Sequence, residues 1–371
     1  MTEAGPPVSP RQLQIGIVGL GFGARIHIPA FQADPRCAVM AVCASRPERA
    51  REIAQRLRIS RAIERWQELV ADPAIDIVAI ATPPASQPEI AIAAFEHGKY
   101  VLCEKPLANT LDAARRVLAA AHRAGTAHAI DFEFPLIPSW ERAKDLLDAG
   151  GIGRMRHAVI SWQAETYASR TGLESWKTRP EEGGGVLNAF GSHVLYHVEW
   201  MLGRIRRISA RLRATADGVA NGAGEHGASL WLELLDGTPV SVSINSDARW
   251  GSGHRMELYG DAGTLRLEND SSDYVRGFRL LYGGPSDRVL HSIPASPEAQ
   301  GSSGDGRLEA VTRFVRRFID GILGAPSSYP SLEDGYRVQC LLDAARCSHE
   351  SGTWIGINLP EAIPAQGTAF A

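Results

Sequence analysis

Cysteine, long apolar runs and surplus charge are all scarce in this chain. Its 371 residues include 5 cysteines, and no two of them form a Cys-x-x-Cys pair. Buried, reduced thiols in a cytoplasmic protein are the simplest interpretation of that usage. The formal net charge is only -3, so the chain has no basic field that would attract nucleic acid.

Nothing in the sequence predicts membrane insertion or secretion. The longest apolar runs, such as residues 75–81, are too short to cross a bilayer. Residues 1–10 lack the basic start and apolar core of a signal peptide and are expected to form a flexible tail. The rest of the chain is too long for one ordinary core, which predicts two domains. Because the residue pattern changes near position 135, we expect these domains at 11–134 and 135–371.

The most informative motif lies near the N-terminus. An apolar run at 15–18 ends in the cluster Gly19-Leu-Gly21-Phe22-Gly23-Ala24, and a helix-compatible segment follows. This order is typical of the phosphate-binding turn of a dinucleotide fold. Gly19 permits the tight turn, Gly21 lets the backbone approach a pyrophosphate, and Ala24 keeps the helix close to the strand. The N-terminus of the helix then offers free N–H groups to the anion.

Apolar and amphipathic segments alternate through residues 13–132. Continuous apolar runs such as 75–81 are typical of parallel strands that are buried on both faces. The alternation therefore predicts a doubly wound α/β sheet, that is, a Rossmann domain. The expected strands are 13–19, 38–44, 75–81, 100–103 and 128–132, and the expected helices are 24–33, 47–57, 66–70, 87–98 and 111–124.

After residue 135 the pattern becomes α+β. Asp236-Gly237 is a hairpin signal between two segments of strand composition. We therefore expect a large, mostly antiparallel open sheet with a few helices. The expected strands are 156–163, 229–235, 240–245, 256–259 and 265–268, and the expected helices are 139–147, 307–323 and 332–351.

Several segments together resemble the Gfo/Idh/MocA family of oxidoreductases (glucose–fructose oxidoreductase/inositol dehydrogenase). Besides the glycine turn, they are Thr82-Pro83-Pro84, Glu104-Lys105-Pro106, the glycine-rich segment 183–193, and Ser331-Leu-Glu-Asp334. The resemblance covers residues 13–357. It implies that the second domain supplies most substrate contacts and pairs subunits into a homodimer or homotetramer through its open sheet.

Lys105 is the first candidate catalytic residue. It follows a strand at the carboxyl edge of the sheet, where open α/β sheets bind ligands. Its ammonium can donate a hydrogen bond to a reacting hydroxyl or carbonyl oxygen and stabilise charge as hydride moves. A surface lysine beside a proline turn is the alternative, and the resemblance favours catalysis. It also places Glu104 near the nicotinamide ribose, although Glu104 equally suits a plain ion pair with Lys105.

His193 is the second candidate catalytic residue. Hydride transfer to or from a carbinol must be matched by proton movement, and histidine titrates near neutral pH. His193 falls where the resemblance places an acid/base histidine; a hydrogen-bonded structural histidine is the alternative. Family members often carry aspartates at positions that here are Ala189 and Tyr196. Asn188, Tyr196 or His197 could replace these carboxylates by hydrogen bonding.

Further candidate substrate or metal-binding residues are suggested by their positions in the chain. The family's arginine after the fifth strand is missing, and Glu133 there either faces the substrate or is a solvated carboxylate. Trp176 suits the face of a sugar ring or is packing. His193 and His197 are four residues apart, as in half of a helical metal site, but no third ligand stands at metalloprotease spacing, so no metal is expected. His27 is expected to pack near the cofactor without a catalytic role.

The cofactor is expected to be NADP(H), with NAD(H) as the alternative. NAD-preferring folds usually end the second strand with a carboxylate that binds the ribose 2′-hydroxyl. Here that position is Ala44, and Ser45 and Arg46 follow, which suit a 2′-phosphate. A solvated or adenine-stacked Arg46 is the other interpretation. The expected cofactor contacts are Gly19, Gly21, Phe22, Gly23, Ala24, Ser45, Arg46, Thr82, Pro83, Glu104 and Lys105.

The sequence thus predicts an NAD(P)-dependent oxidoreductase. It would move hydride between nicotinamide and a hydroxyl- or keto-bearing carbon of a sugar, nucleotide-sugar or cyclitol. One alternative is a non-catalytic dinucleotide-binding regulator of the same fold. Another is a redox-neutral epimerase or glycosidase, in which the hydride returns to the substrate. The expected partner is a small polyol or sugar, with no nucleic acid and no membrane.

Overall fold

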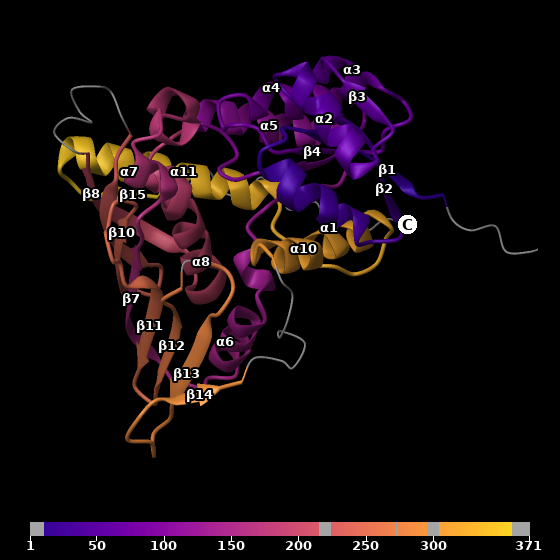
Figure 1. Cartoon of the computed structure of the whole chain (residues 1–371). Coiled ribbons are helices and arrows are strands. Elements are labelled where there is room, and N and C mark those ends of the chain that lie inside the picture. Colours follow the sequence, from indigo (N-terminus) through magenta and orange to yellow (C-terminus); the bar gives the residue numbers. More distant parts are fainter. Residues whose placement is uncertain (1–10, 215–223, 272, 295–303, 358–371) are drawn as a thin grey trace, which may run out of the picture.

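The structure, a computed structural model, describes residues 11–214, 224–271, 273–294 and 304–357. The expected tail at 1–10 lies outside these ranges. Figure 1 shows two lobes: helices surround a first sheet in one lobe, and a broad second sheet forms the other. Helix α11 (Leu332–Ser351) contacts strands of both sheets and so joins the lobes. No helix of the described residues has the length and apolarity that a membrane span requires.

The first sheet has six parallel strands in the order β3-β2-β1-β4-β5-β6, which confirms the predicted Rossmann domain. The central strand β4 is buried along its whole length, as its continuous apolar run predicts. The strands are β1 (Leu13–Val18), β2 (Cys37–Cys43), β3 (Arg61–Ile63), β4 (Ile77–Ile80), β5 (Tyr100–Cys103) and β6 (His128–Ile130). Because the strand order reverses beside β1, ligands are expected at the carboxyl ends of β1 and β4.

The helices of this domain lie close to their predicted ranges. The helix after the glycine turn differs, because it begins as a π-helical turn, η1 (Gly23–His27), and only then continues as α1 (Ile28–Gln32). The others are α2 (Pro47–Leu57), α3 (Trp66–Ala71), α4 (Gln87–Glu96) and α5 (Leu111–Ala124). Helix α5 shows why these ends are readable from sequence: the Thr110 hydroxyl caps the Ala113 N–H, and Gly125 ends the helix with a left-handed φ of 63°.

The second sheet has nine strands in the order β14-β13-β12-β11-β7-β10-β9-β8-β15. All neighbouring pairs are antiparallel except β7 and β10, which confirms the predicted mostly antiparallel sheet. The strands are β7 (Met155–Gln163), β8 (Ile205–Arg213), β9 (Gly227–Leu234), β10 (Pro239–Asn245), β11 (Gly253–Gly260), β12 (Thr264–Asn269), β13 (Arg279–Gly283), β14 (His291–Ile293) and β15 (Ile355–Gly356).

Helices cover one face of this sheet and leave the other open (Figure 1). Alternate side chains such as Ile160 and Trp162 are buried, whereas Trp231 on the opposite face is 59% exposed. The helices and short turns of this domain are η2 (Phe134–Leu136), α6 (Pro138–Asp148), α7 (Tyr167–Thr171), η3 (Trp176–Thr178), η4 (Pro180–Glu182), η5 (Leu187–Gly191), α8 (Ser192–Leu202), α10 (Arg307–Ile322) and α11. Helix α8, which carries His193, was not predicted as a separate helix.

Candidate active site

The glycine turn leaves room for a phosphate group. Gly19 has a φ of 96°, and a Cβ at this position would lie 2.3 Å from the carbonyl oxygen of Ala81. Only glycine fits there, because both the φ and the contact exclude a side chain. A Cβ at Gly21 would meet nothing within 4 Å, so the backbone faces open space. The turn thus has the close-packed first glycine and the exposed second glycine that a pyrophosphate site needs.

A pocket of about 540 Å³ adjoins this turn at the carboxyl ends of β1, β2 and β4. The Thr82 hydroxyl is buried there and has no hydrogen-bond partner among the residues that the structure describes. An unpartnered hydroxyl beside a glycine cradle fits a bound dinucleotide, whose oxygens would satisfy it. The lining includes the predicted contacts Gly19, Gly21, Ser45, Arg46 and Thr82, together with Ala44, Arg49, Glu64, Arg65 and Trp66.

The other predicted cofactor contacts lie around this pocket. Gly23 and Ala24 open η1, and Pro83 follows Thr82 in the turn after β4. The ring of Phe22 lies edge-on to His27, with 5.3 Å between ring centroids, and beneath the guanidinium of Arg307 at 5.1 Å. Phe22 is therefore held between the two domains, since Arg307 begins α10.

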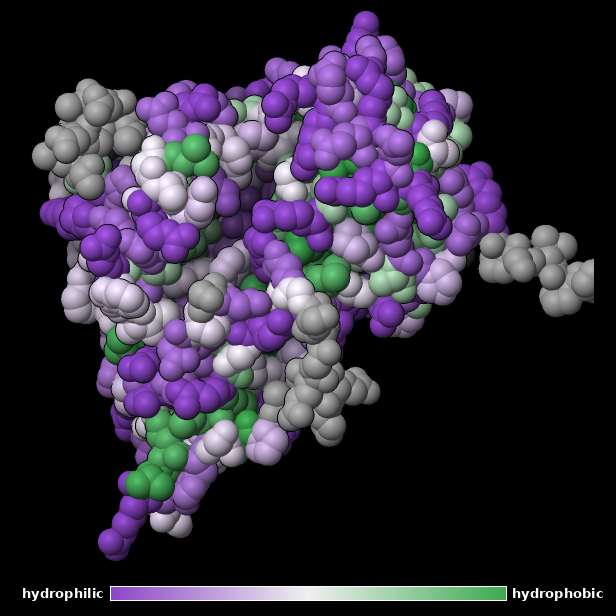
Figure 2. Space-filling view, in the orientation of Figure 1, coloured by the Kyte–Doolittle hydropathy of each residue, from purple (hydrophilic) through white to green (hydrophobic). Residues whose placement is uncertain are grey.

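Lys105 lies where the two domains meet. It follows β5, and its Nζ donates a hydrogen bond to the backbone oxygen of Ala189 at 3.0 Å. Burial lowers the pKa of its ammonium, and the nearby carboxylates Glu133, Glu104 and Asp131 oppose that shift. Figure 2 shows a hollow in the molecular surface between the two lobes. The hydrogen bond to Ala189 therefore holds the Lys105 ammonium against the backbone of the second domain.

His193 and Glu133 come from different elements and meet beside Lys105. The Nδ1 atom of His193, in the first turn of α8, lies 3.8 Å from Oε2 of Glu133, which follows β6. Both side chains are buried. Burial, with Lys105 nearby, holds the pKa of His193 well below its usual value. Burial also raises the pKa of Glu133 to about 8, and Lys105 partly offsets this rise.

The remaining predicted substrate residues differ in whether their side chains are already hydrogen-bonded or packed within the protein. The Asn188 amide is engaged within the protein, since it donates to Gly183 O at 3.0 Å and accepts from Arg346 at 2.6 Å. The ring of Tyr196 stacks on Phe132 with 4.3 Å between centroids.

Tyr196 also lines a separate pocket of about 490 Å³, which Trp200 and Asp334 share. His197 is buried against Trp140 and Phe134, with no hydrogen-bond partner for either ring nitrogen among the described residues. Trp176 is half-buried on η3.

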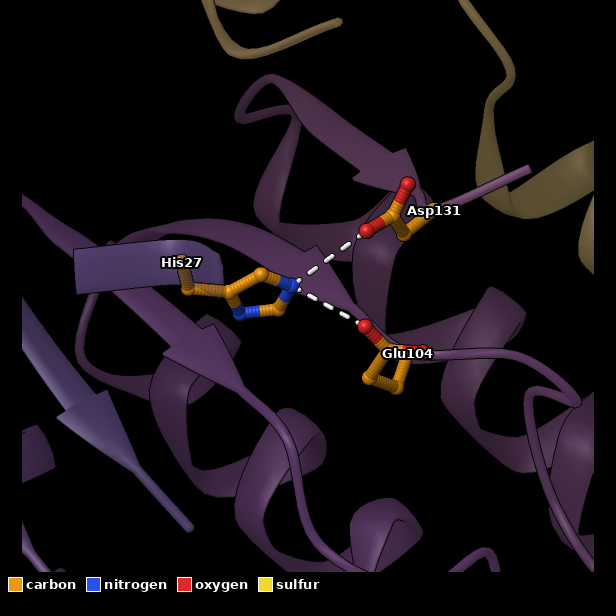
Figure 3. A group of neighbouring side chains, drawn as sticks. All are labelled: His27, Glu104 and Asp131. Carbon is orange, nitrogen blue, oxygen red and sulfur yellow. Dashed lines mark hydrogen bonds and ion pairs between the residues drawn. The ribbon is translucent and has the colours of Figure 1, made fainter. Parts of the chain in front are cut away.

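From the sequence, Asp131 has no predicted role and His27 is expected only to pack near the cofactor. Figure 3 shows the His27 ring pointing its Nε2 atom at two carboxylates, Glu104 and Asp131. The distances are 3.0 Å to Glu104 Oε1 and 3.3 Å to Asp131 Oδ2. One signal was present in the sequence: His27 lies between Ile26 and Ile28, and Asp131 likewise interrupts an apolar run. A titratable residue inside an apolar run needs a buried partner.

The fold and the site together define a class of protein. A parallel sheet with a glycine turn of this kind is typical of dinucleotide binding. A lysine at the same sheet edge, facing the second domain, is suited to act on a substrate bound between them. Residues 13–132 match the model of an oxidoreductase family with an NAD-binding Rossmann fold, and residues 140–266 match the Gfo/Idh/MocA C-terminal domain. The chain belongs to the Gfo/Idh/MocA family of oxidoreductases, as its motifs predicted.

Individual relatives cover nearly the whole chain. An uncharacterized oxidoreductase of Synechocystis sp. is 29% identical over 358 residues, which cover 93% of this chain and 96% of that protein. The levoglucosan dehydrogenase of Pseudarthrobacter phenanthrenivorans is 26% identical over 388 residues, with coverage of 94% and 98%. A solved structure of levoglucosan dehydrogenase in complex with NADH and levoglucosan has a TM-score of 0.85 and 23% identity, with coverage of 94% and 100%. That likeness shows a shared fold.

Proposed function

We propose that this protein is an NAD(P)-dependent dehydrogenase of a sugar, nucleotide-sugar or cyclitol. The observation that carries the proposal is the meeting of Lys105, Glu133 and His193 at the sheet edge next to the dinucleotide pocket. The family and the sugar substrate named for one relative support it. A bound nicotinamide cofactor would accept or supply the hydride.

The protein's own residues would bind the substrate oxygen and move its proton. The Lys105 ammonium has three N–H donors, and one of them is used by Ala189 O. Another can donate to the reacting oxygen, which orients it and stabilises negative charge there. Of the two neighbours, Glu133 is better matched than His193 to take up or return the proton near neutral pH, because the pKa of Glu133 is about 8 and that of His193 is depressed. His193 and Trp176 would then contact the substrate.

The test of this function is a substrate panel with both cofactors. We expect reduced-nicotinamide absorbance to change with at least one polyol or keto-sugar, and the product mass to change by two hydrogens. No redox change with any compound would favour a dinucleotide-binding regulator. A changed substrate with no net redox change would favour the redox-neutral epimerase or glycosidase.

Within this function we propose a preference for NADP(H) over NAD(H). Arg46 lines the pocket with Ser45, Arg49 and Arg65, and β2 does not end in a carboxylate. We expect NADPH to bind more tightly than NADH, and Arg46→Ala to narrow that difference by about tenfold to a hundredfold, since a hydrogen bond to a charged group contributes about 1.5–3 kcal/mol. Fluorescence titration of both cofactors measures this difference.

Arg56→Ala is the matched control for that titration. Arg56 lies exposed in the last turn of α2, the helix that follows Arg46, and does not line the pocket. It should leave both affinities unchanged. Equal affinities for the two cofactors in the unmodified protein would contradict the preference.

We also propose that the open face of the second sheet pairs subunits into a homodimer or homotetramer. The exposed Trp231 on β9 and Trp354 next to β15 support this, because large aromatic side chains are favoured at interfaces. The cytoplasm is the proposed compartment, in keeping with five unpaired cysteines.

A further inference from the structure

A buried histidine lies between two carboxylates next to the strand end that carries Lys105. His27 is fully buried on η1, and Asp131 after β6 is 1% exposed. Glu104, the residue before Lys105, completes the group at 3.0 Å from His27 Nε2 (Figure 3). Three polar side chains from three separate elements thus meet where the glycine turn approaches the carboxyl ends of β5 and β6.

A proton on His27 would offset one of the two carboxylate charges that face it. Burial alone would lower the pKa of His27, but the hydrogen bonds and charges of Asp131 and Glu104 outweigh burial and raise it to about 9. Burial raises the pKa of Asp131 to about 6, so this carboxyl is ionised at neutral pH. The other charged groups nearby are Lys105, which acts on Asp131, and Arg307 from α10, which acts on Lys105.

We propose that His27 and Asp131 are positioning residues for the catalytic strand end: the His27 imidazolium ties the Glu104 carboxylate to Asp131. This inference rests on the proposed function, because its purpose is to fix Glu104 and the adjoining Lys105. Glu104 is bonded directly to Lys105, so anchoring its side chain restricts the backbone from which the Lys105 ammonium extends. Catalysis depends on such anchoring, since a displacement of about 1 Å costs about a hundredfold in rate.

The variant His27→Gln tests the role of the charge. Glutamine can donate hydrogen bonds but carries no positive charge to set against the two carboxylates. We expect kcat to fall about tenfold to a hundredfold, with KM for the substrate changed less than about threefold. In the unmodified protein His27 keeps its proton at neutral pH and loses it as pH rises through about 9. An alkaline decline in kcat near that pH should therefore be present in the unmodified protein and absent in His27→Gln.

His122→Gln is the matched control. His122 is a half-exposed histidine that also contacts a carboxylate, with its Nε2 atom 2.8 Å from Glu333 Oε1. This variant should keep both kcat and the alkaline decline. If His27→Gln behaved like His122→Gln, the positioning role would be rejected.

A second measurement does not depend on turnover. Nitrogen NMR of histidine-labelled protein should show His27 protonated at pH 7 and losing its proton near pH 9, with Asp131→Asn lowering that pKa by at least about one unit. A neutral His27 at pH 7 would overturn the proposal.

The three ligand atoms also lie within 4.8 Å of one another, as in a metal site. Stoichiometric zinc in the purified protein that is lost in His27→Gln would overturn the proton bridge in favour of a metal. If the substrate panel showed no dehydrogenase activity, the proposed function would fail while the NMR result still decided the state of His27.

Discussion

Lys105→Met is expected to lower kcat/KM by about a thousandfold or more while the dissociation constant of the cofactor changes less than about threefold. Methionine keeps the length and apolar stem of lysine but has no N–H to donate. The reacting oxygen would lose its hydrogen bond and the nearby positive charge together. The dinucleotide pocket is lined by the ends of β1 and β2 and by residues that follow β1, β2, β3 and β4, and Lys105, which follows β5, is not among them. Steady-state kinetics and fluorescence titration of the cofactor separate the two effects.

Lys144→Met is the control for the loss of a lysine. Lys144 pairs with Asp148 one turn along α6 and does not line the dinucleotide pocket. Its replacement should leave kcat/KM unchanged. Full activity of Lys105→Met would reject a catalytic role for Lys105, and equal losses of activity and cofactor affinity would point to a role in cofactor binding.

The first domain was predictable because its determinants are local. The apolar run of β4 indicates a strand buried on both faces, and Gly19 indicates a turn that tolerates no side chain. The start of the first helix was predicted less well, because the sequence does not distinguish the π-helical turn η1 from an α-helical turn. Helix α8 was missed as a separate element because it continues directly from a glycine-rich segment, and glycines usually indicate loops.

The side chains that surround Lys105 were harder to assign, because their partners are distant in sequence. His27 and Asp131 are 104 positions apart, and Lys105 reaches Ala189 across 84 positions. No spacing rule connects such pairs; the fold alone brings them together. Asn188 illustrates the converse, since its side chain is suited to a substrate but is engaged with Gly183 and Arg346. The position of a residue in a motif indicates whether it lies near a site. Its hydrogen-bond partners within the protein decide whether its side chain is free to contact a substrate.

Glu133→Gln is expected to lower kcat for alcohol oxidation by about a hundredfold or more, because glutamine cannot accept the proton. The pKa of Glu133 is raised to about 8 by burial. The ionised carboxylate is the base, so kcat of the unmodified protein should rise as pH rises through about 8, before the decline near pH 9 that the loss of the His27 proton predicts. In Glu133→Gln that rise should be absent. The pH dependence of kcat, measured with saturating cofactor, tests this directly.

Stability separates this role from a structural one. A carboxyl whose pKa is raised in the folded state costs stability as pH rises from the ordinary glutamate value toward 8, because the unfolded chain ionises first. Glu133→Gln removes that cost, so its melting temperature at pH 8 should equal or exceed that of the unmodified protein. Glu350→Gln, an exposed position on α11, is the control and should change neither property. An active Glu133→Gln that keeps the rise in kcat near pH 8 would show that another group takes up the proton and would reject this role for Glu133.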